Sequence, residues 1–273
     1  MTDWQAFTVE TSDHVAQVTL TGPGKGNAMG PAFWRELPEI FAALDADPEV
    51  RAIVLTGSGK HFSYGLDLPA MSGTFGPLLA DKALAAPRTD FLHEIRRMQA
   101  AVTAVADCRK PVIAAVSGWC IGGGLDLIAA VDIRYASADA KFSLREAKVA
   151  IVADIGSLHR LPAIIGEGHL RELAYTGKDI DAARAEKIGL VNDVFDDQQA
   201  TLEAAHATAR EIAANPPLVV QGAKDVMDQR NASAVAEGLR YVSAWNAAFL
   251  PSEDLTEAIQ AVFEKREPRF KGR

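Results

Sequence analysis

The sequence predicts an α/β core over residues 1–197 and a C-terminal helical region over residues 198–273. Two apolar runs typical of buried strands, 51–56 and 111–116, are separated by helical patterns, as in parallel sheets built from right-handed crossovers. From residue 198 onward the pattern is almost wholly helical. A chain of 273 residues, 48% hydrophobic and 23% charged, can bury a core large enough to need neither disulfides nor a structural metal.

The N-terminal half alternates strands with helices. Residues 15–21 alternate apolar and polar side chains, as a half-buried strand does. Pro31 suits the first turn of a helix, and the apolar positions that follow give that helix one buried face. Residues 70–88, rich in Gly, Pro and Ala, are expected to form a mobile loop with short helical turns. A helix is expected over 90–105.

The second half contains shorter elements before the helical region. Strands are expected at 133–135, 141–144 and 190–195, and helices at 123–130, 154–161, 166–175 and 182–188. In the C-terminal region we expect helices over about 198–214, 217–228, 232–248 and 253–265. No repeat or long linker divides the chain into independent domains.

Composition excludes several classes of function. The net charge is −8, which argues against broad binding of nucleic acid. The two cysteines, Cys108 and Cys120, have no CxxC or Cys/His ligand spacing, so neither a zinc site nor a disulfide framework is expected. The sequence shows neither a signal peptide nor an apolar run long enough to span a membrane, so we expect a cytoplasmic protein that binds no membrane.

Two loops carry glycines at the ends of predicted strands. Residues 63–67 follow the strand at 51–56, and residues 122–124 follow the strand at 111–116. Parallel strands end at the same edge of a sheet, where ligands bind, so backbone N–H groups of both loops can meet there as an oxyanion hole. The alternative is two tight turns that need glycine for their geometry. Residues 120–124 do not form the GxGxxG motif of dinucleotide-binding proteins, and residues 57–60 are too short for a P-loop.

Three carboxylates lie in apolar surroundings after the second glycine loop: Asp126, Glu146 and Asp154. Carboxylates among apolar neighbours are costly unless they are paired or functional. Close like charges do not all ionise, so we expect at least one carboxyl to hold a proton at neutral pH. Structural roles are the alternative: Asp126 near a helix N-terminus, Asp154 as an N-cap, and Glu146 solvated and paired with Arg145 or Lys148.

At these motifs the sequence resembles the crotonase, or enoyl-CoA hydratase/isomerase, superfamily over nearly the whole chain. The resemblance rests on Asn27-Ala28-Met29 and on the segments 62–68, 110–116 and 118–132. It implies a spiral of ββα units, a C-terminal helical trimerisation region, and assembly as a homotrimer or a dimer of trimers. It also implies an acyl-CoA thioester as substrate, with no cofactor or metal besides the CoA of that substrate.

The resemblance also assigns site residues. It implies that the N–H groups of Leu66 and Gly123 form the oxyanion hole for the thioester oxygen. The residues expected to bind the substrate are Tyr64, Gly65, Leu66, Asp67, Leu68 and Gly123. Because charge on the thioester oxygen grows as the α-proton leaves, such donors stabilise the enolate more than the substrate.

Within the superfamily, the carboxylates resemble those of Δ3,5-Δ2,4-dienoyl-CoA isomerases. A typical hydratase has glutamates at the positions of Asp126 and Glu146, and glycine at the position of Asp154. Moving two double bonds requires proton transfer at C2 and at C6, which one carboxylate does not easily reach alone. We expect Glu146 to act at C2 as base and Asp154 at C6 as acid, with the reverse order open, and Asp126 to assist.

Two other functions remain as alternatives. One is an enoyl-CoA hydratase or another acyl-CoA isomerase on the same scaffold. The other belongs to a different class, a CoA-binding protein without catalytic activity. The three carboxylates favour an enzyme over the second alternative.

Overall fold

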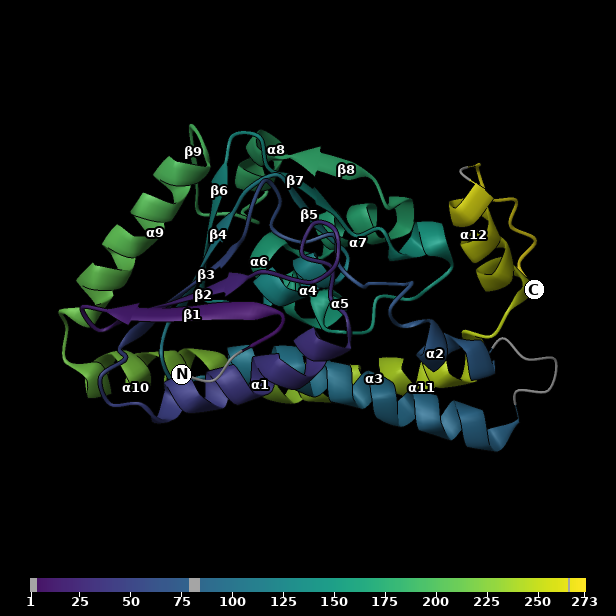
Figure 1. The fold of residues 1–273 in the computed structure, drawn as a ribbon, viewed down its shortest axis with the longest axis horizontal. Coiled ribbons are helices and arrows are strands. Elements are labelled where there is room, and N and C mark those ends of the chain that lie inside the picture. The colour runs from purple at the N-terminus through teal and green to yellow at the C-terminus, as the bar shows by residue number, and fades with distance from the viewer. Residues whose placement is uncertain (1–3, 79–83, 265) are drawn as a thin grey trace.

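Two β-sheets organise the part of the chain that the computed structural model describes, residues 4–78, 84–264 and 266–273 (Figure 1). The large sheet has the strand order β1-β2-β3-β4-β6-β9, in which β1 pairs antiparallel with β2 and the other pairs are parallel. Its strands are β1 (Phe7–Ser12), β2 (Val15–Leu20), β3 (Ala52–Gly57), β4 (Val112–Val116), β6 (Ile133–Ser137) and β9 (Asp193–Phe195).

The small sheet is built from segments that follow or precede strands of the large one. Its strands, in the order β5-β7-β8, are β5 (Trp119–Ile121), β7 (Lys141–Ser143) and β8 (Asp179–Asp181). The chain passes from β4 to β5 and from β6 to β7, so successive turns of the chain add one strand to each sheet. A parallel bridge between Ser63 and Cys120 continues this arrangement into the loop after β3. The predicted α/β fold is therefore confirmed.

Helices cover the sheets on several sides. Before the C-terminal region these are α1 (Pro31–Ala46), α2 (Ser72–Phe75), the 3₁₀ turn η1 (Gly76–Leu78), α3 (Ala85–Ala106), α4 (Gly123–Ala129), the 3₁₀ turn η2 (Glu146–Val149), α5 (Ser157–Arg160), α6 (Pro162–Ile165), α7 (Glu167–Thr176) and α8 (Ala182–Lys187). The C-terminal helices are α9 (Gln198–Ala213), α10 (Pro217–Asp228), α11 (Ala232–Phe249) and α12 (Glu253–Glu264). Within the described ranges, no helix is long and apolar enough to cross a membrane.

The apolar character of β3 and β4 follows from burial on both faces. Successive side chains of a strand point to opposite faces. One face, which includes Val54 and Ile113, packs on small residues of α9 such as Ala205 and Ala209. The other face, which includes Leu55, belongs to the main core with α1 and α3. A strand covered on both sides reads as a continuous apolar run, which is why these two strands were predicted correctly.

The C-terminal helices return to the core. Helix α9 lies along one face of the large sheet, whereas α1, α3 and α11 form a layer on the other side (Figure 1). Helix α11 packs on α3 and α5, and α12 lies near η2. The four C-terminal helices begin and end within one or two residues of their predicted bounds. The division of the chain at residue 197 stays a prediction.

Several local expectations were wrong. Helix α3 begins at Ala85, inside the segment expected to be a loop, because Pro87 falls in its first turn, where proline is tolerated. Of that segment, residues 79–83 lie outside the described ranges. Helix α5 begins only at Ser157, so Asp154 precedes it and is not its N-cap. Strand β1 was not predicted, because its mostly exposed residues lack a regular alternation.

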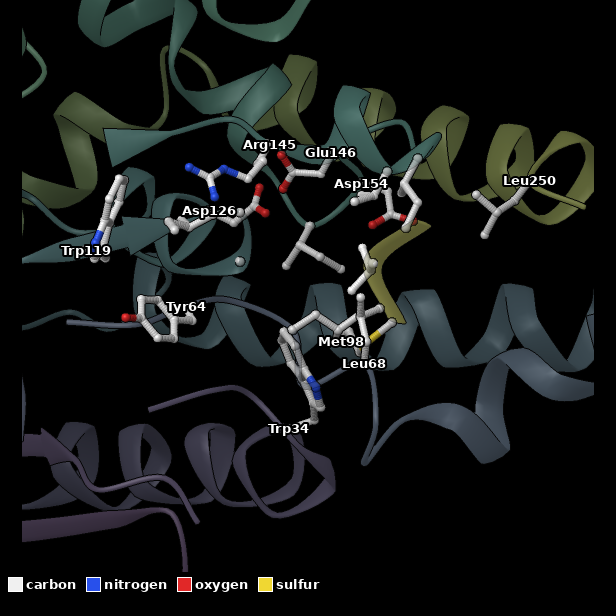
Figure 2. A pocket seen from close by; sticks show the side chains of 18 of the residues that line it. Trp34, Tyr64, Leu68, Met98, Trp119, Asp126, Arg145, Glu146, Asp154 and Leu250 are labelled. Carbon is white, nitrogen blue, oxygen red and sulfur yellow. The ribbon is translucent and has the colours of Figure 1, made fainter. Parts of the chain in front are cut away.

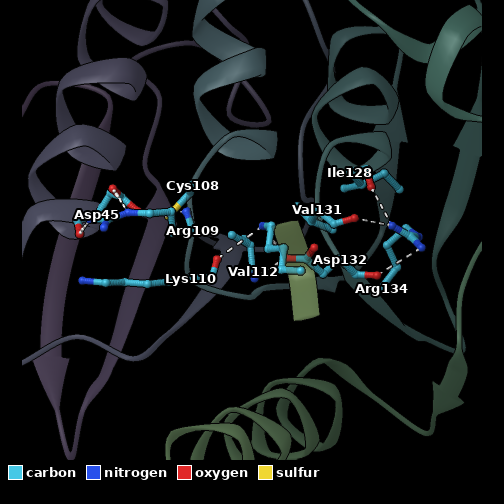
Figure 3. A network of polar contacts seen from close by, with 10 residues as sticks. Asp45, Cys108, Arg109, Lys110, Val112, Ile128, Val131, Asp132 and Arg134 are labelled. Carbon is cyan, nitrogen blue, oxygen red and sulfur yellow. Dashed lines mark hydrogen bonds and ion pairs between the residues drawn. The ribbon is translucent and has the colours of Figure 1, made fainter. Parts of the chain in front are cut away.

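A buried ion pair attaches α10 to the core. The Lys224 side chain is 6% exposed, and its Nζ lies 2.8 Å from Oδ2 of Asp132. The same oxygen accepts a 2.7 Å hydrogen bond from the Val112 amide at the start of β4 (Figure 3). Lys224 also donates to the Lys110 carbonyl. Asp132 thus joins a helix of the C-terminal region to the central strand of the large sheet.

Replacement of Lys224 should destabilise the fold. Lys224→Ala leaves Asp132 without its cation, and because the Asp132 side chain is 26% exposed we expect a loss of about 2 kcal/mol of unfolding free energy, less than for a fully buried pair. Urea unfolding followed by circular dichroism measures this change. Lys271→Ala is the control, because its pair with Glu253 is more than half exposed, and it should change stability by less than about 0.5 kcal/mol. Equal effects of the two variants would contradict the structural role of Lys224.

Candidate active site

A pocket of about 610 Å³ lies where the small sheet, α3 and the C-terminal helices meet. Most of its lining is apolar, contributed by side chains such as Trp34, Met98 and Leu250 (Figure 2). The charged residues in its lining are Asp126, Arg145, Glu146 and Asp154. The structure therefore brings the three predicted carboxylates to one cavity, although they come from three different elements.

The two glycine loops meet at this pocket. Ser63 donates its amide to the Trp119 carbonyl at 3.0 Å and accepts the Ile121 amide on its own carbonyl at 3.0 Å. Gly65 has φ +77°, and a Cβ at this position would lie 2.5 Å from the Ile121 carbonyl oxygen. Glycine is thus required here both for the backbone conformation and for the close approach of the two loops.

The amides of Leu66 and Gly123 lie side by side. A Cβ placed on Gly123 would lie 3.7 Å from the Leu66 nitrogen, and a Cβ on Gly65 would lie 3.0 Å from the Gly123 nitrogen. Gly123 is the first residue of α4, so its N–H has no partner within the helix. Among the described residues, neither amide donates a hydrogen bond. Two free N–H groups at the wall of an apolar pocket can bind one oxygen that carries negative charge.

Asp126 is the carboxylate that the protein stabilises most. It is 1% exposed, and its Oδ1 accepts a 2.6 Å hydrogen bond from the Ser157 amide at the start of α5. Burial raises the pKa of Asp126, while the Ser157 hydrogen bond and the charge of Arg160 oppose that rise. Asp126 therefore links α4 to α5 and also places a carboxylate beside Glu146.

Glu146 is stabilised less than Asp126, because one of its carboxylate oxygens has no donor. Its Oε2 is buried without a hydrogen bond within the described part of the chain. A Cβ on Gly122 would lie 3.2 Å from Oε1, so the glycine leaves room for this carboxylate. Burial, together with the charge of Asp126, raises the pKa of Glu146 to about 8. A carboxylate that is this poorly stabilised as an anion is a strong base for its type.

Asp154 lies farther along the same wall, toward Leu250 (Figure 2). Its Oδ2 accepts a 2.6 Å hydrogen bond from the side chain of Asn246 on α11. Burial raises the pKa of Asp154 to about 7, and the hydrogen bond from Asn246 limits that rise. At neutral pH the Glu146 and Asp154 carboxyls together therefore hold at least one proton, as expected from their proximity in sequence.

The structural alternative for Asp126 holds, since it lies in the first turn of α4, whereas Asp154 is not an N-cap. Glu146 does not pair with Arg145, because the Arg145 guanidinium lies 2.5 Å from Asp179 and packs over the ring of Trp119 at 5.4 Å.

Among the described residues, no group of three His, Cys, Asp or Glu side chains is arranged to hold a metal ion.

Only some of the residues predicted to bind the substrate line the pocket. The pocket lining includes Tyr64, Leu66, Leu68 and Gly123. Gly65 shapes the turn between them, and Asp67 accepts the Ala70 amide at 3.0 Å. A binding role stays a prediction for all six residues.

Sequence reasoning missed the contribution of the C-terminal helices. Three residues of this region lie more than 90 positions after Asp154, the last predicted site residue. The side chain of Asn246 contacts Asp154, and the pocket lining includes Leu250 and Val262. Leu250 and Val262 cannot be told from ordinary core residues by their pattern. Asn246 carries a usable signal, because it is a polar residue on the otherwise mainly apolar buried face of α11.

Comparisons with known proteins show which family and which relatives this chain resembles. The family model described as "Enoyl-CoA hydratase/isomerase" matches residues 10–273. A mitochondrial Delta(3,5)-Delta(2,4)-dienoyl-CoA isomerase of Dictyostelium discoideum is 42% identical over 99% of this chain and 93% of its own. A peroxisomal protein of the same name from Arabidopsis thaliana is 42% identical over 95% of this chain and 94% of its own.

Solved structures show the same fold. An enoyl-CoA hydratase/isomerase from Xanthobacter autotrophicus Py2 has a TM-score of 0.84 at 28% identity, covering 99% of this chain and 100% of that one. One from Mycobacterium paratuberculosis has a TM-score of 0.82 at 30% identity, covering 93% and 97%. With a family model matched over almost its whole length and relatives at 42% identity, the chain belongs to the enoyl-CoA hydratase/isomerase family.

Proposed function

We propose that this chain is a dienoyl-CoA isomerase, which converts a 3,5-dienoyl-CoA to the 2,4-dienoyl-CoA. The observation that carries the proposal is the row of carboxylates along one pocket wall, in which Asp154 lies beyond Glu146, toward Leu250 (Figure 2). Relatives at 42% identity that bear the name of this activity support it.

The thioester oxygen binds to the amides of Leu66 and Gly123. Glu146 removes a proton from C2, and the electron pair of that C–H bond forms a conjugated enolate that extends from the thioester oxygen to C6. The two amides stabilise the oxygen more strongly as its negative charge grows. Asp154 then gives its proton to C6, the carbonyl re-forms, and the double bonds lie at C2 and C4.

The pKa values of the two carboxyls place their shared proton on Glu146 more often than on Asp154, so the reactive form is the one in which that proton has passed to Asp154. Once ionised, Glu146, with the higher pKa of about 8, gains more from accepting a proton. Asp154, with the Asn246 hydrogen bond, has the lower pKa, about 7, and gives up its proton more readily. Asp126 raises the pKa of both through its charge. Because Glu146 ends the cycle protonated and Asp154 ionised, one proton must return to Asp154 before the next turnover.

The choice of substrate tests the proposal. Purified protein mixed with 3,5-octadienoyl-CoA should produce the absorbance of a conjugated 2,4-dienoyl thioester. Crotonyl-CoA, the substrate of a hydratase, should be hydrated little under the same conditions. Rapid hydration of crotonyl-CoA without isomerisation of the diene would instead support a hydratase, and CoA binding without either reaction would support a non-catalytic protein.

Asp154→Asn should abolish most of the isomerisation. The amide cannot give a proton to C6, so kcat should fall by about 10²- to 10⁴-fold, the usual contribution of a general acid or base. Binding of CoA esters, measured by calorimetry, should change little because Asn keeps the size of the side chain. Asp196→Asn is the control, since Asp196 is exposed and lies outside the pocket. A kcat within threefold of wild type would show that Asp154 is not the acid.

Assembly as a homotrimer or a dimer of trimers is a further part of the proposal. It is supported by exposed apolar side chains on α10 and α11, including Leu218, Val226, Met227 and Tyr241, all at least two-thirds exposed. Light scattering should give three or six times the mass of one chain. Met227→Glu should lower that mass, whereas Tyr175→Glu, on α7, should not. A single-chain mass for the wild type would contradict the assembly.

The absence of a cofactor and the cytoplasmic location also stay proposals. CoA enters only as part of the substrate in the reaction described above. The names of the most similar relatives place those proteins in mitochondria or peroxisomes.

A further inference from the structure

The side chain of Asn246 contacts Asp154 from α11, far away in the sequence. Asn246 is 1% exposed. Its Nδ2 donates to the Val152 carbonyl at 2.8 Å and to Oδ2 of Asp154 at 2.6 Å. A carbonyl oxygen can only accept a hydrogen bond, so the Val152 contact fixes which end of the Asn246 amide is the NH₂ group. Both hydrogens of Nδ2 are then used, one on each acceptor.

A second amide holds the backbone of the same residue. Gln99, on α3 and 6% exposed, donates its Nε2 to the Asp154 carbonyl at 2.6 Å and to the Leu239 carbonyl of α11 at 3.0 Å. Asp154 itself lies in a segment without regular structure, between η2 and α5. Its position is therefore set by two buried amides from helices that are distant in sequence.

We propose that Asn246 and Gln99 are positioning residues that hold Asp154 so that Oδ2 always accepts from Asn246 and Oδ1 carries the transferable proton into the pocket. An oxygen that accepts an N–H bond is poorly placed to carry a proton of its own, because two hydrogens would face each other. Among the described residues, Asn246 is the one side chain that donates to this carboxyl, the other donor being the backbone amide of Asp154 itself, and Asp154 lines the pocket. The inference rests on the proposed function for the role of that proton.

The two amides act on different properties of Asp154. The hydrogen bond from Asn246 favours the ionised carboxylate, so its loss raises the pKa of Asp154. The Gln99 bonds reach only backbone carbonyls, so their loss moves the residue without removing a donor from the carboxylate. The other charged groups that face this carboxyl are Asp126 and Glu146, and neither is changed by these substitutions.

The experiment compares Asn246→Leu, Asn246→Ala and Gln99→Leu with wild type. Both Asn246 variants remove the donor without adding a charge, and the Ala variant needs less room in case the Leu variant folds poorly. In both, the limb of the pH profile of kcat that reports Asp154 should move to higher pH by about one unit, because the lost hydrogen bond stabilised the ionised carboxylate. In Gln99→Leu, kcat should fall by about tenfold with the pH dependence unmoved.

Ser243→Ala is the matched control on α11. Its hydroxyl is buried but donates only to the Arg240 carbonyl of the same helix, so kcat and its pH dependence should stay as in wild type. Unmoved pH profiles in both Asn246 variants, or an equal displacement in Gln99→Leu, would overturn the proposal.

A measurement without turnover separates this inference from the proposed function. Titration of Asp154 by carboxyl ¹³C NMR, assigned with Asp154→Asn, should give a higher pKa in the Asn246 variants than in wild type. If the wild type isomerises no diene but the titration moves, the proposed function fails and the hydrogen-bonding assignment stands. If the diene is isomerised and the titration does not move, the assignment fails alone.

Discussion

The constraint on which the site depends is the free energy of placing three carboxylates in one mainly apolar pocket. Removing a carboxylate from water is costly unless donors replace the water or the group keeps its proton. Asp126 has the Ser157 amide and Asp154 has the side chain of Asn246, whereas Oε2 of Glu146 has no donor among the described residues. This unequal supply of donors, together with the charge of Asp126, makes the pKa of Glu146 higher than that of Asp154.

The backbone supplies the complementary half of the chemistry. Where the loop after β3 meets the start of α4, glycines allow a close approach that places the amides of Leu66 and Gly123 side by side. These donors sit where negative charge develops on the substrate, whereas the carboxylates are placed where protons are exchanged. Because the amides belong to backbone that is hydrogen-bonded on both sides of each loop, they need little reorganisation when the charge appears.

The C-terminal helices complete what the sheets begin. Helix α11 supplies Asn246 to Asp154, and the residue after that helix, Leu250, lines the far end of the pocket. Helix α10 is attached to β4 through Lys224 and Asp132 (Figure 3). A loss of docking by these helices would therefore remove a donor from the site as well as apolar surface from the core. Stability of the C-terminal region and acidity of Asp154 are coupled in this fold.

The sequence by itself determined the α/β core, the C-terminal helices, the two glycine loops and the three carboxylates. These carry local signals: apolar runs where strands are covered on both faces, helical periodicity, and charged or glycine residues in places that disfavour them. Only the tertiary structure decided which donors each carboxylate receives, because those partners lie about 30 residues away for Asp126 and more than 90 for Asp154. A pKa depends on such contacts and on burial, and neither is written in the neighbouring sequence.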